Sequence, residues 1–299
     1  MNDQEETQSK KLHGDWKVLE GLLRGDRQRD EALAADAAEE EKLQRKQEYE
    51  AFNRKLSELR LGKYAYFLNY GYVQNHNPHF SKVVPRDGEF DTNSRRLIYE
   101  VIGECPLDDS EVVDVGCGRG AVPIALQGHF RPSSYRGIDL SSEAIAFCRE
   151  RHKIPNVRFE TGDAESLPLA SEAFDVLINI ESSHNYPHIE AFFHECLRVL
   201  RPNGWFLYTD FMAPEAFDRH TQLLQEIGFA MTRAVDITSN VLRSCDETAS
   251  TRMQAYQNPE QRAYMADFLA APGSKTYRVF EQGLLCYRLF TFRKIASAT

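Results

Sequence analysis

Several residues that can act as acids, bases or ligands directly follow one apolar segment. The segment INIESSHNYPH spans Ile178 to His188, and its apolar start leads into Glu181 and His184. Histidine titrates nearest to neutral pH, so His184 is a candidate general base for removing the proton of a hydroxyl group. Glu181, or a nearby acid such as Asp210, would orient the imidazole and stabilise its charged form.

Simpler roles compete for the histidines of this region. His184 can serve as a structural hydrogen-bonding group, His188 can cap the helix expected to follow it, and His194 falls on the expected surface of that helix. A metal site is not expected, because no clear third and fourth ligands accompany His184 and His188.

The segment VVDVGCGRG predicts a turn that lies close to a ligand. A run of β-branched residues ends at Asp114 and is followed by Gly116, Gly118 and Gly120. Without side chains, the backbone can turn tightly and approach a ligand, and the helix expected next presents its N-terminus there. The spacing is G-x-G-x-G, whereas dinucleotide-binding turns have G-x-G-x-x-G, so the motif alone does not identify the ligand.

Two further acids are expected at the same edge of the sheet. Asp139 ends the next predicted strand, roughly 20 residues after Gly118, where an acid can bind two ribose hydroxyls. Asp163, in GDAESLPL, ends the third strand and can accept a hydrogen bond from an adenine amino group. Each acid taken alone has the alternative role of capping a helix. Their combination with the glycine turn favours a nucleoside site, because ligands of open α/β sheets bind outside the carboxyl ends of the strands.

The elements that position these residues alternate between strand and helix patterns. From residue 92 to 228, short runs of Val, Ile and Phe alternate with segments of helical spacing, which predicts a parallel sheet with helices on both faces. Two late strands are expected at 230–238 and 283–294. Residues 239–282 between them have a mainly helical pattern and are long enough to form a lid.

Composition excludes several classes of protein. The 299 residues carry a formal net charge of −9, which argues against binding a nucleic-acid backbone. No apolar run approaches the roughly 20 residues that cross a bilayer, and the polar N-terminus lacks the apolar core of a signal peptide. The six cysteines contain no C-x-x-C pair, as is typical of free thiols in a reducing compartment. We therefore expect a cytoplasmic protein.

Residues 1–62 differ in composition from the rest and are expected to form a helical extension or linker. They are rich in Ala, Glu, Lys and Arg before the expected helix stop at Gly62. The apolar residues Tyr49, Phe52, Leu56 and Leu59 form one face of that helix. Two interpretations stay open: a solvated extension, or a helix that docks the domain onto a larger assembly.

These segments together resemble class I S-adenosylmethionine-dependent methyltransferases. The resemblance rests on VVDVGCGRG, GIDLSSEAI, GDAESLPL, FDVLINIE and LRVLRPNGWFLYTD, and covers roughly residues 64–293. IESSHNYPH is similar to mycobacterial phthiotriolone-type lipid methyltransferases and to O-methyltransferases of polyketide assembly lines. One departure is Asn203, where the family's vLRPGG turn commonly has glycine; asparagine tolerates the positive φ.

The resemblance implies an α/β fold with a Rossmann-like, seven-stranded, mostly parallel sheet and an antiparallel last strand. It places a methyltransferase domain at 63–299, with lid elements at about 63–91 and 239–282. It also implies S-adenosyl-L-methionine as the cofactor.

The residues that would contact the cofactor follow the first four strands: Asp114, Gly116, Gly118, Asp139, Leu140, Asp163, Ala164 and Asn179. The first three would line the methionine moiety, Asp139 would hold the ribose, and residues 163–164 would hold the adenine. Tyr66 and Tyr72 would cover the sulfonium, unless they are core aromatics.

The function expected from this resemblance is O-methylation of a hydroxyl of a polyketide or related natural-product intermediate, with His184 as base. The substrate would be free or bound to an acyl carrier protein, and the chain would be a separate enzyme or a domain of a larger synthase. The alternatives are a C-methyltransferase, a non-methylating cyclase-like member of the fold and, more remotely, a nicotinamide-dependent enzyme. Neither nucleic acid nor a membrane is an expected partner.

Overall fold

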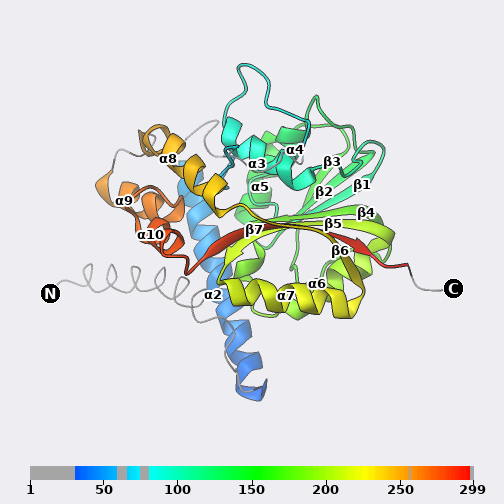
Figure 1. Ribbon diagram of the computed structural model, residues 1–299. Coiled ribbons are helices and arrows are strands. Elements are labelled where there is room, and N and C mark those ends of the chain that lie inside the picture. Colours follow the sequence, from blue (N-terminus) through cyan, green and yellow to red (C-terminus); the bar gives the residue numbers. More distant parts are fainter. Residues whose placement is uncertain (1–30, 59–65, 75–80, 255, 257, 297–299) are drawn as a thin grey trace.

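A single mixed sheet forms the centre of the protein. A computed structural model describes residues 31–58, 66–74, 81–254, 256 and 258–296. The sheet has the strand order β3-β2-β1-β4-β5-β7-β6 (Figure 1). The strands are β1 (Glu111–Val115), β2 (Ser134–Asp139), β3 (Val157–Thr161), β4 (Phe174–Ile180), β5 (Leu200–Met212), β6 (Phe229–Asp236) and β7 (Cys286–Lys294).

The last strand is the antiparallel one. β7 lies between β5 and β6 and pairs antiparallel with both, whereas the pairs β1–β2, β1–β4, β2–β3 and β4–β5 are parallel. The carboxyl ends of β1 to β4 therefore meet at one edge of the sheet. This confirms the predicted seven-stranded, Rossmann-like arrangement.

Helices cover both faces of the sheet. In chain order they are α2 (Glu31–Glu58), α3 (Thr92–Ile102), α4 (Ala121–Leu126), α5 (Ser142–Arg151), the 3-10 turn η2 (Ser183–Asn185), α6 (Ile189–Val199), α7 (Pro214–Ile227), α8 (Thr238–Gln254), α9 (Pro259–Phe268) and α10 (Lys275–Glu281). α3, α4 and α5 lie on one face, and α6 and α7 on the other (Figure 1). Alternate strand residues face the two apolar layers: Val112 packs in the first and Val113 in the second.

Local sequence signals account for the ends of several elements. The Ser141 side chain accepts a hydrogen bond from the backbone N–H of Ala144 and caps α5, as is common for serine before a helix. α7 ends at Gly228, whose φ is 120°. Asn203 has a φ of 62°, as its place in the expected turn requires. The expected helix stop at Gly62 lies outside the described residues.

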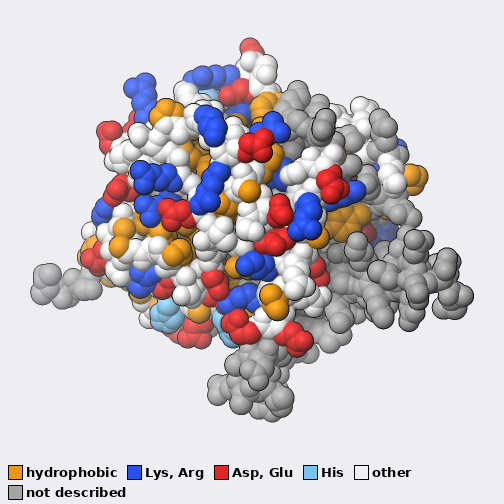
Figure 2. All heavy atoms as spheres, turned by 180° about the vertical axis from the view of Figure 1, so that it is seen from behind, with side chains coloured by type: hydrophobic (Ala, Val, Ile, Leu, Met, Phe, Trp, Pro, Cys, Tyr) orange, Lys and Arg blue, Asp and Glu red, His pale blue; other side chains and the backbone are white. Residues whose placement is uncertain are grey.

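The surface carries both signs of charge. Figure 2 shows Lys and Arg side chains interspersed with Asp and Glu side chains on the face turned away from the view of Figure 1. All six cysteines are buried and free. None of the described helices is both long and apolar enough to cross a membrane.

Candidate functional site

One cavity gathers residues from the carboxyl ends of β1 to β4. The glycine turn after β1 forms part of its wall, and Gly116, Gly118 and Gly120 all have positive φ angles of 75°, 52° and 74°. A Cβ atom on Gly116 would collide with the hydroxyl group of Ser182. On Gly118 it would meet no described atom within 4 Å, so glycine is favoured there by its positive φ, and the space beside it is open to a ligand.

Asp139 lines the cavity from the end of β2 and is held by the backbone. Its Oδ2 atom accepts a hydrogen bond of 2.8 Å from the N–H of Gly118, and its Oδ1 atom one of 2.9 Å from the N–H of Ser141. Burial raises the pKa of Asp139, although these two hydrogen bonds act in the opposite direction. The carboxylate is fixed beside the glycine turn, as required for binding a diol.

Asp114, at the end of β1, also lines the cavity but is almost fully buried. Its Oδ2 atom accepts a hydrogen bond from the Tyr135 hydroxyl. Burial raises the pKa of Asp114 to about 7, against the lowering effect of that hydrogen bond. Asp114 is therefore a group that gains or loses a proton near neutral pH.

Asp163 and Ala164 line the cavity beyond β3, where the acid is paired with helix α2. The Lys42 ammonium lies 3.0 Å from Oδ2 of Asp163 and also contacts the Glu165 carboxylate. Glu39, Glu165 and His188 form a group whose potential ligand atoms lie within 4.8 Å of one another. Lys42 contacts both Glu39 and Glu165, so one ammonium already offsets part of the negative charge of this group.

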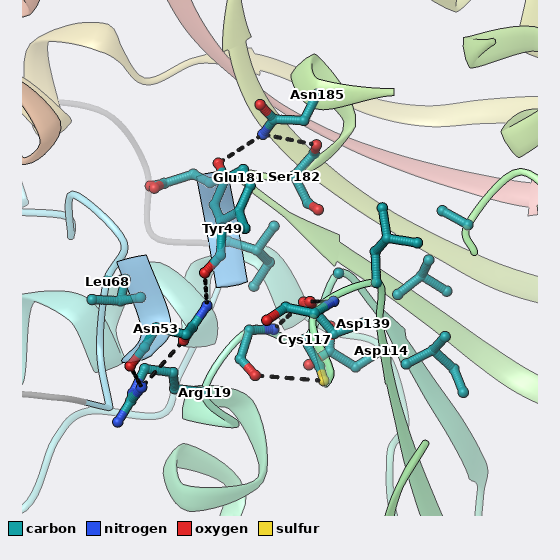
Figure 3. Close-up of a pocket in the computed structure, with 18 of the residues that line it drawn as sticks. Tyr49, Asn53, Leu68, Asp114, Cys117, Arg119, Asp139, Glu181, Ser182 and Asn185 are labelled. Carbon is teal, nitrogen blue, oxygen red and sulfur yellow. Dashed lines mark hydrogen bonds between the residues drawn. The ribbon is translucent and has the colours of Figure 1, made fainter. Parts of the chain in front are cut away.

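Helix α2 closes the cavity opposite the sheet. Figure 3 shows Tyr49 and Asn53 of α2 between the glycine turn and the segment 181–185. The Asn185 amide donates a 3.0 Å hydrogen bond to the Tyr49 hydroxyl. Burial raises the pKa of Tyr49 to about 12. The part of α2 from residue 42 to 53 is thus a wall of the site as well as an N-terminal helix.

Helix α2 is also attached to Arg119, within the glycine turn. Arg119 is 1% exposed, and its Nη1 atom donates to the backbone oxygen of Asn53 at 3.1 Å and to its side-chain oxygen at 3.2 Å. The guanidinium also lies 3.5 Å from the ring centroid of Phe147. Burial lowers the pKa of Arg119 to about 10. Our sequence analysis did not identify Arg119 or Asn53, because an arginine between two glycines has no signature for such a contact.

Glu181 follows β4 and lines the cavity in an unusual backbone conformation, with a φ of 49°. Its Oε1 atom accepts hydrogen bonds from the backbone N–H of Tyr70 at 2.9 Å and the hydroxyl of Tyr287 at 2.6 Å. Burial raises the pKa of Glu181 to about 7, although both hydrogen bonds lower it.

His184, in η2, pairs with Asp210 of β5. Its Nδ1 atom lies 2.7 Å from Oδ1 of Asp210, and its backbone N–H donates to Oδ2 at 3.0 Å. Burial raises the pKa of Asp210, but the His184 charge and the hydrogen bonds together lower it below its ordinary value. Of the two acids expected to orient His184, the structure thus places Asp210 in contact with the imidazole. Glu181 bonds to Tyr70 and Tyr287 instead.

Three expected site residues lie behind the cavity wall. Asn179 is fully buried and donates to the backbone oxygen of Val115 at 2.8 Å, so it holds β4 to the end of β1. Tyr72 is 1% exposed in the core beside α3, with its backbone N–H bonded to Asn93. The preceding Gly71 has a positive φ. Tyr72 is not among the residues that line the cavity, which speaks against its expected place at the sulfonium, whereas Tyr66 lines the cavity.

His184 is the third of these residues: Ser182 and Asn185 on either side of it line the cavity, and His184 packs against Phe211 at a ring distance of 4.5 Å. Its side chain is 8% exposed. The remaining expected contacts, Gly116, Gly118, Asp139, Leu140, Asp163 and Ala164, all line the cavity.

Comparison with known proteins identifies relatives over most of the chain. A family model described as "Methyltransferase domain" matches residues 113–208. The "Fatty-acid O-methyltransferase" of Mycolicibacterium smegmatis (strain ATCC 700084 / mc(2)155) is 32% identical over 232 residues, which are 77% of this chain and 84% of that protein. The "Phthiotriol/phenolphthiotriol dimycocerosates methyltransferase" of Mycobacterium tuberculosis (strain ATCC 25177 / H37Ra) is 30% identical and covers 76% and 85% of the two chains.

A solved structure has the same fold at lower identity. The crystal structure of the [4+2]-cyclase SpnF aligns with a TM-score of 0.66 and 22% identity, and covers 84% of this chain and 95% of its own. At that identity the likeness supports the fold and carries no information about the reaction.

Proposed function

Because this chain belongs to the S-adenosylmethionine-dependent methyltransferases, we propose that it transfers a methyl group to a hydroxyl of a polyketide or related lipid-like intermediate. The family and its cofactor are established by the comparisons. The hydroxyl acceptor is supported chiefly by one observation, the hydrogen-bonded pair of His184 and Asp210 beside the cavity.

The cavity fits S-adenosylmethionine in the chemistry of its donors and acceptors. The open space at Gly118 and the carboxylate of Asp139 match a ribose held against the glycine turn. Leu140, Asp163 and Ala164 would hold the adenine end, and Asp114 and Gly116 the methionine end. When bound, the cofactor supplies an electrophilic methyl group on a positively charged sulfur.

The protein's own contribution to the reaction is to position the acceptor and accept its proton. Methyl transfer is an in-line displacement, so aligning the nucleophile accounts for much of the rate. Asp210 holds Nδ1 of His184, which leaves Nε2 as the atom to take the hydroxyl proton. Ser182 and Asn185, on either side of His184 in the chain, line the cavity, so in this proposal the acceptor hydroxyl approaches at this part of the wall.

The walls of the cavity favour an acceptor with a large apolar part. Phe52 of α2, Tyr66, Leu68 and Phe268 of α9 contribute aromatic and aliphatic surface. Two relatives whose names refer to a fatty acid and to phthiotriol lipids agree with such an acceptor. The proposal covers an acceptor that is free or bound to an acyl carrier protein. It also covers a chain that is a separate enzyme or a domain of a larger synthase.

A second candidate acceptor is an oxygen of a fatty acid. The name of the 32% identical relative favours it, and so does Lys46, which brings positive charge to the α2 side of the cavity. A carboxylate is already ionised at neutral pH and needs no base. The role of His184 therefore separates the two acceptors.

The test is a direct assay of S-adenosylhomocysteine release, with mass spectrometry of the products, on β-hydroxyacyl thioesters, phenols and free fatty acids. We expect methyl ethers from the hydroxyl substrates, with turnover that depends on His184. Methyl esters from fatty acids at a rate unaffected by His184→Ala would replace the proposal with the second candidate. A new C–methyl bond would indicate a C-methyltransferase. Conversion of a substrate without release of S-adenosylhomocysteine would indicate a cyclase-like reaction.

A further inference from the structure

Glu181 is a carboxyl group in the cavity wall whose position is fixed from three sides. Its backbone has the positive φ that non-glycine residues rarely adopt, and its Oε1 atom is bound by the Tyr70 N–H and the Tyr287 hydroxyl. Such strain persists where surrounding contacts impose it, and it is concentrated at functional sites. Both donors bind the same carboxylate oxygen, Oε1. Within the described residues, the other oxygen, Oε2, has no hydrogen bond.

No lysine or arginine in the described part of the chain forms an ion pair with Glu181. The arginine of α2 that lines the same cavity, Arg45, lies within 4 Å of Glu41 and Glu48. The titratable groups that act on Glu181 come from the 66–74 segment, η2, β5, α8 and β7: Tyr70, His184, Asp210, Cys245 and Tyr287. Within this set, only His184 can supply a positive charge, and it is already paired with Asp210.

A half-buried carboxylate in the cavity wall without a cationic partner is costly, so in the free protein the acid form of Glu181 is favoured more than that of an exposed glutamate. The pKa of Glu181, raised to about 7 by burial, agrees with this geometric argument. A positively charged ligand in the cavity would reverse the preference, because an opposite charge nearby favours ionisation.

The sheet order places Glu181 where such a ligand carries its charge. β1 lies between β2 and β4, so the cavity runs from Asp139 past the glycine turn to Glu181. If Asp139 holds the ribose, the sulfur of the cofactor would lie farther along this line, toward the end of β4. The glycine turn packs closely on the residue after Glu181, because a Cβ on Gly116 would collide with Ser182.

We propose that Glu181 is the counter-ion of the cofactor's sulfonium and that cofactor binding makes the Glu181 carboxyl group release its proton to solvent. The inference rests on the cofactor and is independent of the acceptor proposed above. Loss of the methyl group leaves a neutral thioether, so the charge that keeps Glu181 ionised disappears and the carboxylate can take up a proton again. Glu181 would thereby favour the methylated over the demethylated form of the cofactor.

The proposal has quantitative consequences for binding. With a pKa of about 7, Glu181 is half protonated at pH 7, so binding S-adenosylmethionine should release about half a proton from this group at that pH. Affinity should be about tenfold weaker at pH 6 than at pH 8, because ionising Glu181 opposes binding only at the lower pH. S-adenosylhomocysteine, which has no sulfonium, should show neither effect from this residue.

The experiment is isothermal titration calorimetry with both ligands, in phosphate and in Tris, whose different ionisation enthalpies report the protons released. The parent protein is compared with Glu181→Gln and, as a matched control, with Glu190→Gln on the exposed surface of α6. Protons from the ligand's own groups are common to all three proteins. The parent and the control should therefore release about half a proton more than Glu181→Gln at pH 7 with S-adenosylmethionine.

Equal proton release by the parent and Glu181→Gln would overturn the proposal. It would also be overturned if the difference between these two proteins were the same with S-adenosylhomocysteine as with S-adenosylmethionine. If Glu181→Gln does not fold, Tyr287→Phe decides the question. Removing the phenol's hydrogen bond should raise the pKa of Glu181, so proton release at pH 7 should rise from about half toward one. An unchanged value would overturn the proposal. A failure of every candidate acceptor would leave these binding results unaffected, so the two proposals can fail separately.

Discussion

Nδ1 of His184 lies 2.7 Å from Oδ1 of Asp210, and the backbone N–H of the same histidine donates to the other carboxylate oxygen. The acid thus holds both the ring and the backbone of His184. Asp210 is fully buried in β5 and also accepts a hydrogen bond from the Ser183 hydroxyl at 2.6 Å. This arrangement fixes the tautomer with the Nδ1 proton facing the acid, so Nε2 is the atom available as a base.

Replacing His184 by alanine should lower turnover by about 10²–10⁴-fold, the usual contribution of a positioned base. Cofactor affinity should stay near the parent value, because the imidazole lies outside the cavity residues that would hold the cofactor. Turnover and calorimetric affinity measure the two effects. His194→Ala, at an exposed position of α6, is the matched control and should leave both unchanged. Near-parental turnover in a folded His184→Ala variant would refute the base assignment.

The cofactor site can be tested at Asp139. Its replacement by alanine removes charge-assisted hydrogen bonds to two ribose hydroxyls, each worth about 1.5–3 kcal/mol. We expect calorimetry to show cofactor affinity weakened by at least about tenfold, in a protein that still melts cooperatively. Asp139→Asn, which keeps an acceptor oxygen, should cost less. Unchanged affinity of Asp139→Ala would remove the ribose assignment.

The strand ends and the acids that follow them could be predicted from the sequence because their signals are local. Asp139 ends β2 and Asp163 follows β3, and the glycines of 116–120 form the tight turn that their spacing indicated, each with a positive φ. Parallel strands bring such positions to one edge of a sheet wherever the helices pack. These inferences required no knowledge of tertiary contacts.

Other parts of the site depend on contacts between distant residues and left no local signal. The expected helix face of Tyr49, Phe52 and Leu56 gave an apolar surface but not its partner. Phe52 on this face packs against Tyr264 and Phe268 of α9. The neighbouring Asn53 accepts hydrogen bonds from Arg119, whose charge gave no reason to place it in a buried contact. For Tyr72, the sequence could not show that the residue lies in the core beside α3.

Truncation should separate the two parts of the N-terminal region. Deleting residues 1–40 should leave the fold and cofactor binding intact, because the cavity residues contributed by α2 begin at Lys42. Deleting residues 1–58 should weaken cofactor binding, since it removes the wall formed by Tyr49 and Asn53. It also removes the Asn53 oxygens that accept hydrogen bonds from Arg119. Melting curves and calorimetry on both truncations measure these effects.

The two truncations also bear on the division of the chain at residue 62. If deleting residues 1–40 abolishes the melting transition, the N-terminal region is needed for folding. Equal cofactor affinity after both deletions would contradict a role for α2 in the site. The point variant Lys42→Met, which removes the ion pair with Asp163 but keeps the helix, should have an effect between the two.

The buried acid Asp114 should make the protein less stable as the pH rises toward neutral. Its folded-state pKa is about 7, above the ordinary value of 3.8, so the folded state retains a proton that the unfolded state has lost. Its contribution is fully present below the unfolded pKa and is lost as the pH rises through the folded one. The loss amounts to at most roughly 4 kcal/mol, at 1.36 kcal/mol per pKa unit. Glu181 should act in the same direction.

Denaturant unfolding of the cofactor-free protein at pH 5 and pH 8 should show Asp114→Asn losing less stability over this interval than the parent. The exposed Asp87→Asn control should follow the parent. An identical pH dependence in Asp114→Asn and the parent would mean that Asp114 stays ionised in the folded protein.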